Sequence, residues 1–457
     1  MTSRQFIVAL LFGLVLRVGI LTQTSTLGTP IMDEQQYSQI ARTAAAGNGY
    51  GWDAQSPTSI RPPLYPALLA MLWKIAGGSN LQVVRAVQIL LSALTAALVY
   101  VLGATIWSPR VGRLAAVIYW FYPSLIFYDY LILTETLFTL LLVAFVLATV
   151  KLVQQPRAAF AIACGLTLGL AALTRSVLWP LPLILCPALF LVLDVTWRQR
   201  LALAALVLAA YAVVVGPWAV RNTRLQGVFT VVDTMGGMNL RMGNYEYTPD
   251  DRMWDAVGLQ GDKNWVYGIN DDLGNGPITE GQKEKWAQRK AIAYMRAHPV
   301  TTLRRSVIKF ADFWGLEREF MAGAQKGMYA PPLWFEVVAS AVILLGYVFV
   351  TIVGAFGIWI AVPEDKRIHA VLLLPVLVLM GAHTIVFGHS RYHLPLIPIF
   401  GLYAAALIEE RVPVFASSRR IALAGAAASI VVLLSVWVRQ VVVTDFDRIM
   451  SLLHRVS

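Results

Sequence analysis

The chain has 457 residues, of which 58% are hydrophobic and only 14% are charged, and its formal net charge is +11. A water-soluble protein of this length needs a larger share of charged surface, so the composition excludes an ordinary soluble domain. The excess of Lys and Arg does not indicate a nucleic-acid partner, because these residues gather in short segments between apolar runs.

Apolar runs dominate the sequence, and a membrane-spanning helix needs about 20 such residues. The candidates are 6–23, 81–107, 112–128, 133–150, 158–174, 177–194, 200–218, 333–361, 368–387, 392–408 and 419–438. We therefore predict an all-α polytopic membrane protein with about 11 transmembrane helices. Cys164 and Cys186 both fall inside these runs, which is typical of small buried apolar residues rather than of a disulfide or metal site.

Positively charged residues mark one side of the predicted bundle. They lie at alternate ends of successive runs: Arg4, Arg110, Arg113, Lys151, Arg157, Arg198, Arg200, Lys366, Arg367, Arg411, Arg419 and Arg420. Short positive loops are typical of the cytoplasmic side, so we expect a cytoplasmic N-terminus and an external C-terminus in a plasma (inner) membrane. We predict three parts along the chain. A seven-span module at 1–218 includes an external loop at 24–80, an external domain follows at 219–332, and a four-span module occupies 333–457.

The first external loop contains two short predicted helices. Residues 33–46 show helical spacing of apolar residues, with Asp33 as the expected N-cap and Gln36 as its reciprocal partner. Arg61-Pro62-Pro63 then opens a second segment, 64–76, which is too short to span a membrane and should lie at the interface.

Asp33 and Glu34 form an acidic pair just outside the first span. Two readings stay open. In one, both residues only stabilise the start of a helix. In the other, a carboxylate takes a proton from an acceptor hydroxyl, as a general base does.

Four arginines lie at predicted outer ends of spans, against the general charge pattern: Arg61, Arg175, Arg221 and Arg391. Each one alone is consistent with a side chain that snorkels to the headgroups. Four on one side are better explained by an anionic ligand, and a lipid phosphate suits guanidinium groups. Glu135 lies in the same layer, either as a first-turn helix residue or as a functional carboxylate.

Two further charged residues lie near this layer. We expect Asp129 to be solvated, and Arg17, late in the first span, to snorkel outward or to pair with a loop carboxylate.

The external segment 219–332 begins with a strip rich in glycine and asparagine that includes Asn239 and Asn244, and such strips approach other surfaces closely. An amphipathic helix is predicted at 279–297, broken by His298-Pro299. The six histidines are scattered without metal-ligand spacing, and the chain has no glycine-rich phosphate loop. The sequence therefore argues against a metal centre and against direct use of a cytosolic nucleotide.

The order of these motifs resembles the GT-C glycosyltransferases, especially the PMT-type group of aminoarabinose transferases and protein O-mannosyltransferases. The resemblance rests on Asp33-Glu34 with Tyr37, Arg61-Pro62-Pro63, Thr134-Glu135, Leu173-Thr174-Arg175, Pro217-Trp218 through Arg221-Asn222, the Gly-Gly-x-Asn strip, and Arg391-Tyr392 with Leu394-Pro395. It covers most of the chain. It implies a GT-C helical bundle with short juxtamembrane helices and one medium-sized external domain.

The resemblance also implies a reaction, an inverting sugar transfer from a polyprenyl-phosphate donor to a cell-envelope acceptor. By that analogy Asp33 is the general base, with Glu34 and Glu135 as the other acidic residues, and the four arginines hold the donor phosphate. Tyr37, Tyr65, Asn239, Asn244 and Tyr392 are the expected acceptor or sugar contacts. No cofactor is expected, and weak assistance by a divalent cation stays open. The external domain is much smaller than that of the aminoarabinose enzymes, so the acceptor is not implied.

Two other functions remain as alternatives. An envelope polysaccharide ligase or polymerase would use a pyrophosphate-linked donor, with its catalytic arginine or histidine in the large external loop. A lipid or solute transporter would show paired halves and broken helices at the membrane midplane. The carboxylates of this chain cluster in the first loop, which favours the glycosyltransferase.

Overall fold

The computed structural model describes the chain except for residues 251–252, 411–419, 447–449 and 451–457. The described part is helical, and its one β-type pairing is an isolated bridge between Gly51 and Pro57. Eight of its helical segments are long and apolar enough to cross a membrane. These are α1 (Ser3–Gln23), α4 (Leu81–Ile106), α7 (Glu135–Gln154), α10 (Trp197–Gln226), α16 (Leu333–Ile360), α17 (Lys366–Ile385), the continuous segment Ser390–Glu409, and Arg420–Thr444. The predicted polytopic all-α architecture is confirmed.

Three of the predicted spans fall on shorter helices. The run at 112–128 divides into α5 (Pro109–Trp120) and α6 (Pro123–Tyr128), the run at 158–174 forms α8 (Ala158–Ala172), and the run at 177–194 forms η1 (Ser176–Leu178) and α9 (Pro182–Val192). Proline explains the break between α5 and α6, because Tyr122, the residue before Pro123, has an extended backbone. The count of 11 spans therefore stays a prediction.

The last two described spans are also composite. Ser390–Glu409 consists of the 3-10 helix η4 (Ser390–Leu396) and α18 (Ile397–Glu409), and Arg420–Thr444 consists of α19 (Arg420–Arg439) and the π-helical turn η6 (Gln440–Thr444).

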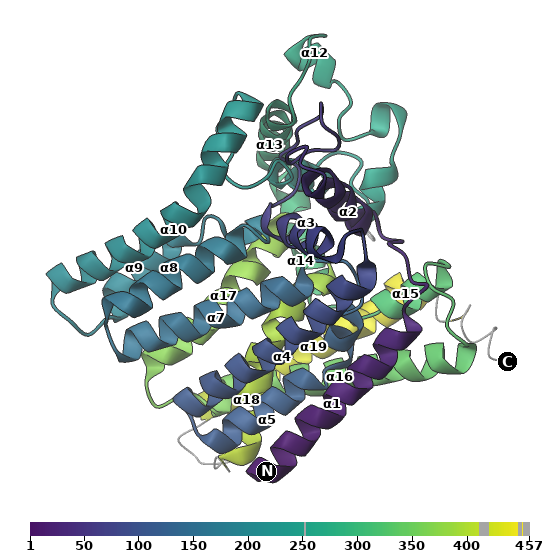
Figure 1. Cartoon of the computed structure of the whole chain (residues 1–457). Helices are drawn as coiled ribbons and strands as arrows, with labels where there is room; N and C mark the ends of the chain where they lie inside the picture. Colours follow the sequence, from purple (N-terminus) through teal and green to yellow (C-terminus); the bar gives the residue numbers. More distant parts are fainter. Residues whose placement is uncertain (251–252, 411–419, 447–449, 451–457) are drawn as a thin grey trace.

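A layer of short helices covers one end of the bundle, opposite the N-terminus (Figure 1). Its members are α2 (Met32–Ala45), α3 (Leu64–Ala76), α11 (Gly236–Met242), η2 (Met253–Gly258), η3 (Gly261–Lys263), α12 (Ile269–Leu273), α13 (Glu280–Ala297), α14 (Pro299–Phe313) and α15 (Glu319–Gln325). The predicted helices at 64–76 and 279–297 are confirmed, and Thr279 caps α13 with Gln282 as reciprocal partner. The segments 24–80 and 219–332 thus meet in one layer.

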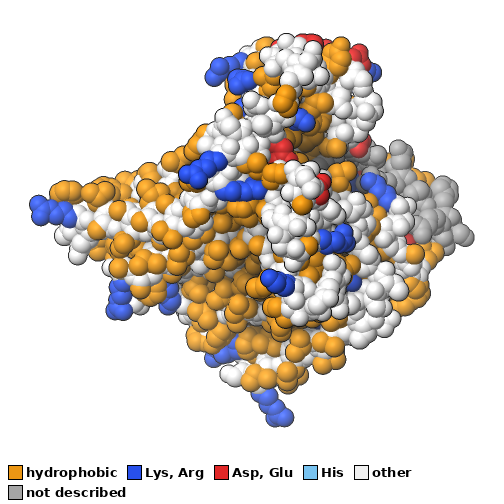
Figure 2. Space-filling view, turned by 45° about the horizontal axis from the view of Figure 1, so that its top comes forward, with side chains coloured by type: hydrophobic (Ala, Val, Ile, Leu, Met, Phe, Trp, Pro, Cys, Tyr) orange, Lys and Arg blue, Asp and Glu red, His pale blue; other side chains and the backbone are white. Residues whose placement is uncertain are grey.

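The molecular surface agrees with this division. On the face shown in Figure 2, hydrophobic side chains cover much of the bundle, and Lys and Arg lie at its lower and left ends as well as over its centre and upper part. The Asp and Glu side chains visible there lie in the upper part, over the layer of short helices. An apolar belt between polar ends is the surface that a bilayer requires.

Helix α7 lies at the centre of the bundle and packs against α4 and α8. One face of α4 is polar at helical spacing, with Arg85, Gln88 and Ser92 all buried. Gln88 Nε2 donates to the carbonyls of Asp129 and Leu131 at 2.8 and 2.9 Å, and Arg85 Nε donates to that of Tyr130 at 2.9 Å. The carbonyl groups of the irregular segment before α7 are thereby hydrogen-bonded within the bundle. Backbone polar groups inside a membrane need such partners, because no water is present there.

Arg17 and Asp129 form a fully buried ion pair between α1 and that irregular segment, with Nε and Oδ2 2.9 Å apart. The guanidinium also lies over the Trp120 ring, 3.6 Å from its centroid, and Ser92 Oγ donates to the other Asp129 oxygen. The expectation that Asp129 is solvated was wrong, because its partners come from helices distant in sequence. Of the two alternatives for Arg17, pairing with a loop carboxylate is confirmed.

Helix α10 is longer than the predicted span at 200–218. Its 30 residues extend about 45 Å at 1.5 Å per residue, which exceeds the roughly 30 Å of a hydrocarbon core. The helix ends where Gly227 adopts a left-handed conformation with φ of 66°. Its last turns, which carry Arg221, Asn222 and Gln226, therefore reach into the layer of short helices.

We predict that Asp129→Asn lowers the free energy of unfolding by about 3 kcal/mol or more, because it leaves the buried Arg17 charge without a carboxylate. Thermal unfolding in detergent measures the change. Asp262→Asn, at an exposed position in the layer of short helices, is the matched control and should change little. Equal effects of the two substitutions would contradict the role of the pair.

Candidate active site

Asp33 lies in the first turn of α2 and accepts hydrogen bonds from two arginines. Arg61 Nη2 is 2.5 Å from Oδ1, and Arg391 Nη1 is 3.0 Å from Oδ2. The predicted N-cap role of Asp33 was wrong: the N-cap is Ile31, and Asp33 is the second residue of the helix. Its side chain therefore points to distant arginines rather than to its own backbone.

Glu34 fills the capping role that the sequence suggested for its neighbour. Ile31 N–H donates to Oε2 at 3.0 Å, and Ile132 N–H donates to Oε1 at 2.8 Å. The residue is fully buried, and burial raises its pKa, opposed by these two backbone donors. Because Ile132 lies three residues before Glu135, Glu34 ties the start of α2 to the start of α7.

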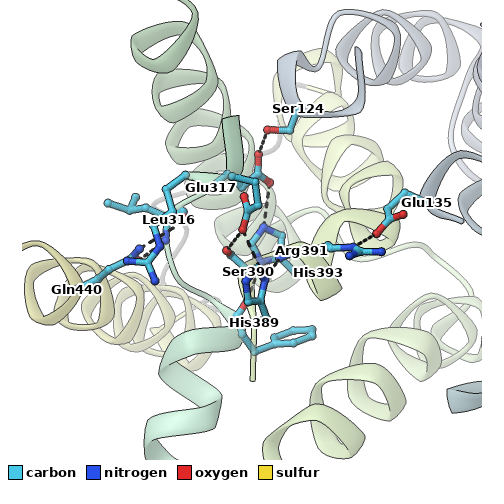
Figure 3. A network of polar contacts seen from close by, with 12 residues as sticks. Ser124, Glu135, Leu316, Glu317, His389, Ser390, Arg391, His393 and Gln440 are labelled. Carbon is cyan, nitrogen blue, oxygen red and sulfur yellow. Dashed lines mark hydrogen bonds and ion pairs between the residues drawn. The ribbon is translucent and has the colours of Figure 1, made fainter. Parts of the chain in front are cut away.

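Glu135 is the first residue of α7 and is fully buried. Its Oε1 accepts hydrogen bonds from Arg175 Nη2 and from Arg391 Nε. Figure 3 shows Arg391 extending from η4 towards Glu135. No donor among the described residues contacts the other oxygen, Oε2, although that atom is buried. A buried carboxylate oxygen without a donor is a candidate acceptor for a substrate hydroxyl.

The ion pairs join five residues into one cluster, in the order Arg61, Asp33, Arg391, Glu135 and Arg175. We call this the arginine–carboxylate cluster. Three guanidinium groups and two carboxylates leave one positive charge in excess. Burial acts to raise the pKa of Asp33, but the charges and hydrogen bonds of Arg61 and Arg391 outweigh it and lower the pKa to about 2.

Each outer arginine of the cluster has a second contact that fixes its guanidinium plane. Arg61 Nε donates to Gln36 Oε1 at 2.8 Å, and Arg175 Nε donates to Thr134 Oγ1 at 2.9 Å. The Tyr37 ring lies under Arg61, 5.2 Å from centroid to Cζ. These contacts leave the cluster with a defined geometry before any ligand is bound.

Arg221 does not contact the carboxylates of the cluster. Its guanidinium donates to the backbone carbonyls of Thr58 and Tyr50 at 2.7 and 2.9 Å. Tyr50 in turn donates from its hydroxyl to the Arg61 carbonyl at 2.9 Å. Arg221 thus holds the loop that carries Arg61, which is a different role from that of the other three arginines.

The three tyrosines among the expected acceptor contacts each pack against another ring. The Tyr37 ring meets the Tyr65 ring edge-on with centroids 5.4 Å apart, and the Tyr65 hydroxyl donates to Gln88 at 2.7 Å. Tyr392 follows Arg391 and stacks on His383 with centroids 4.1 Å apart.

The two asparagines lie on and just after α11. Asn239 is half-buried on that helix. Asn244 is fully buried and accepts a hydrogen bond from Lys309 Nζ at 2.8 Å, while its amide donates to the carbonyls of Leu240 and Ile385. These contacts of Asn244 join the layer of short helices to the end of α17.

Asp233 is a carboxylate that sequence reasoning passed over inside the glycine-rich strip. Burial raises its pKa to about 6, while a hydrogen bond from Ser176, the Met235 N–H and the charge of Arg61 act to lower it. In the sequence, only its position in that strip pointed to Asp233. The strip approaches Arg61 and Ser176 only in the folded chain, so local sequence does not reveal the contact. Asp233 is the second acidic side chain under the electrostatic influence of Arg61.

Among the residues that the structure describes, no three His, Cys, Asp or Glu side chains are grouped as a metal site. The carboxylates of the arginine–carboxylate cluster are engaged by guanidinium groups instead.

We predict that Arg391→Ala lowers the free energy of unfolding more than Arg61→Ala does. Loss of Arg391 leaves the fully buried Glu135 with one cation, and breaking such a pair costs about 3–5 kcal/mol. After loss of Arg61, Asp33 keeps Arg391 and has a side chain that is 22% exposed. Unfolding midpoints of the two purified variants give the comparison, and equal midpoints would show that Arg391 has no special bridging role.

Part of the chain matches a known protein family. Residues 60–219, which include Arg61, Glu135 and Arg175, match the family model for dolichyl-phosphate-mannose-protein mannosyltransferase. No curated protein sequence matches the chain.

Three solved structures are similar to this fold. The apo oligosaccharyltransferase of Archaeoglobus fulgidus has a TM-score of 0.55 at 13% identity, over 95% of this chain and 55% of that one. The same enzyme in complex with Zn and sulfate has a TM-score of 0.51 at 15% identity, over 94% of this chain and 52% of that one. ArnT of Cupriavidus metallidurans has a TM-score of 0.40 at 15% identity, over 86% and 77%.

The chain thus spans about half the length of the oligosaccharyltransferase whose fold it shares. The match at residues 60–219 and the shared fold together confirm the resemblance of this chain to the GT-C glycosyltransferases of the protein-mannosyltransferase type.

Proposed function

We propose that the protein is an integral-membrane inverting glycosyltransferase that moves a sugar from a polyprenyl-phosphate donor to a cell-envelope acceptor. The observation that carries this proposal is the arginine–carboxylate cluster, in which Arg391 lies between Asp33 and Glu135. The arginines proposed to bind the phosphate lie directly beside the carboxylate proposed as the base, and the reaction needs both at one anomeric carbon. The match of residues 60–219 to a mannosyltransferase family supports the same class of enzyme.

The charge of the cluster suits a donor with a single phosphate. A sugar joined to a polyprenol through one phosphodiester carries one negative charge, which balances the one excess positive charge of the cluster. A pyrophosphate-linked donor would bring two negative charges. The balance therefore favours the monophosphate donor over the donor of an envelope ligase or polymerase.

The transfer step follows from the same groups. Asp33 accepts the proton of the acceptor hydroxyl as its oxygen attacks the anomeric carbon. The bond from the anomeric carbon to the phosphate oxygen breaks, and its electron pair stays on the phosphate, which leaves with two negative charges. Arg61, Arg175 and Arg391 stabilise this developing charge. Attack opposite to the leaving phosphate inverts the configuration of the sugar.

Asp33 is a weak base as long as two arginines hold it, because its pKa is about 2. A bound phosphate competes for the same guanidinium groups of Arg61 and Arg391. Each hydrogen bond that moves from Asp33 to the phosphate raises the pKa of the carboxylate towards its ordinary range. The donor thus prepares the base that will act on the acceptor, which limits the chemistry to enzyme with donor bound.

The other acidic and aromatic residues complete the site in this proposal. The unpaired Glu135 Oε2 accepts a hydroxyl of the sugar or of the acceptor. Tyr37, next to Arg61, and Tyr392, next to Arg391, offer ring faces to the sugar. Glu34, Tyr65, Asn244 and Arg221 hold these groups in place through the contacts described above, and Asn239 is assigned to the acceptor side.

The orientation of the chain in the membrane belongs to the same proposal. The cluster lies at the end of the bundle that the short helices cover, away from the N-terminus (Figure 1). Positive residues between the apolar runs put the N-terminus in the cytoplasm and the C-terminus and active site outside, in a plasma membrane. The acceptor is then a glycolipid, polysaccharide or protein of the envelope, and a divalent cation is an addition to test in the assay.

The first experiment measures transfer from radiolabelled polyprenyl-phosphate sugars in membranes that contain wild type, Asp33→Asn or Glu364→Gln. We expect label to reach an acceptor with wild type and with Glu364→Gln, an exposed carboxylate outside the site. Loss of the base should lower the rate by about 100-fold or more in Asp33→Asn. Transfer from pyrophosphate-linked sugars alone would replace this proposal with a ligase or polymerase, and transport without transfer would replace it with a transporter.

A pH profile separates the two carboxylates near Arg61. Asp33, with a pKa of about 2, is already ionised in the free enzyme at any pH above about 4, so kcat/KM should be flat from about pH 5 to 8. Asp233 loses its proton as the pH rises through about 6. A rise of kcat/KM with a midpoint near 6 that disappears in Asp233→Asn would move the base to Asp233.

A further inference from the structure

The 3-10 helix η4 carries Arg391 on one side and is held by two glutamates on the other. Ser390 Oγ donates to Glu319 Oε1 at 2.6 Å, and His393 Nε2 lies 2.9 Å from Glu317 Oε1. Figure 3 shows these contacts on one side of η4, with Arg391 pointing away from them to Glu135. Glu317 belongs to the segment that joins α14 and α15, and Glu319 is the first residue of α15.

Glu317 and His393 form a fully buried pair. His393 Nδ1 lies 2.6 Å from the carbonyl oxygen of Phe313, and a carbonyl can only accept, so this nitrogen carries a proton. Tyr122 donates its hydroxyl to Glu317 Oε1 at 2.6 Å, and Ser124 donates to Oε2. The remaining ring nitrogen, Nε2, faces Oε1, and a protonated ring would donate from it to the carboxylate.

The surroundings of His393 suit a positive ring. The Tyr347 ring is stacked on it with centroids 4.8 Å apart, and the Trp314 ring is stacked at 5.9 Å. Aromatic faces attract a cation that is shielded from water. With Phe313 and Glu317 as acceptors, the imidazolium has partners for both N–H groups, as a buried charge requires.

The segment that carries Arg391 needs such support. A 3-10 helix has poorer hydrogen-bond geometry than an α-helix and is seldom long, and η4 also contains Pro395, which lacks an N–H. Arg391 nevertheless has to reach Glu135 with Nε and Asp33 with Nη1 at once. Anchors at Ser390 and His393 fix the backbone on both sides of Arg391.

We propose that Glu317, acting through His393, is a positioning residue that fixes Arg391 for the donor phosphate and thereby couples the external segment between α14 and α15 to the active site. This inference rests on the proposed function, because it gives Arg391 a phosphate to hold. Glu317 itself touches neither donor nor acceptor. Its effect on catalysis passes through the placement of one guanidinium group.

The test is a double-mutant cycle on the affinity for polyprenyl phosphate, which carries the phosphate without the sugar. The purified proteins are wild type, Glu317→Gln, Arg391→Ala and the double variant, with Glu364→Gln as the control carboxylate. We expect each single substitution to weaken binding by about tenfold, which corresponds to about 1.4 kcal/mol. The double variant should bind like Arg391→Ala alone, because Glu317 then has nothing to position.

Other outcomes overturn the inference in distinguishable ways. If Arg391→Ala weakens binding but Glu317→Gln does not, or if the two losses add, Glu317 does not act through Arg391 while the phosphate role of Arg391 stands. If Arg391→Ala binds as tightly as wild type, the phosphate role fails and the positioning role fails with it.

A second variant keeps the test valid if Glu317→Gln does not fold. Tyr122→Phe removes one donor to Glu317 and leaves the ion pair in place. It should weaken binding in the same direction by a smaller factor, and this loss should vanish in an Arg391→Ala background. An equal loss in both backgrounds would contradict the coupling.

Discussion

Arg391 lies between the carboxylates of Asp33 and Glu135, and burial of these charges is the constraint that shapes the structure around them. A buried charge is tolerated only where partners satisfy it, and the cluster draws its members from distant parts of the chain. Asp33 comes from α2, Glu135 from α7 and Arg391 from η4. The three parts must dock together for any one of the charges to be stable.

Hydrogen bonds to neighbouring helices explain how the segment 24–80 is held in its position. Glu34 joins α2 to the backbone before α7 through Ile132, and the polar face of α4 holds the same segment through Arg85 and Gln88. At the other end of the loop, Arg221 fixes the carbonyls of residues 50 and 58. The groups of the arginine–carboxylate cluster are therefore held by contacts from several helices, and in the proposed function this would let them bind a phosphate without large reorganisation.

Much of this could be predicted from local sequence. The spans, the short helix at 64–76 and the Thr279 cap follow from composition, periodicity and proline, all of which act over a few residues. The alternation of spans and loops also predicted that Arg61, Arg175 and Arg391 lie at the same end of the bundle.

The errors came from tertiary pairing. Asp33 looked like an N-cap because Gln36 follows at the right spacing, but its partner is Arg61 on the next loop. Asp129 looked solvated because the buried Arg17 that pairs with it lies on a different helix. Glu317 and His393 gave no signal at all, because a lone glutamate and a lone histidine acquire meaning only when the fold joins them.

The most direct test is a structure of the protein with polyprenyl phosphate bound. The account predicts a phosphate group in contact with Arg61, Arg175 and Arg391, and an opened ion pair between Arg61 and Asp33 that leaves the carboxylate free to accept a proton. A phosphate bound elsewhere, or one bound while Asp33 keeps both of its arginines, would contradict the assignment of this cluster as the place where the donor is held and the base released.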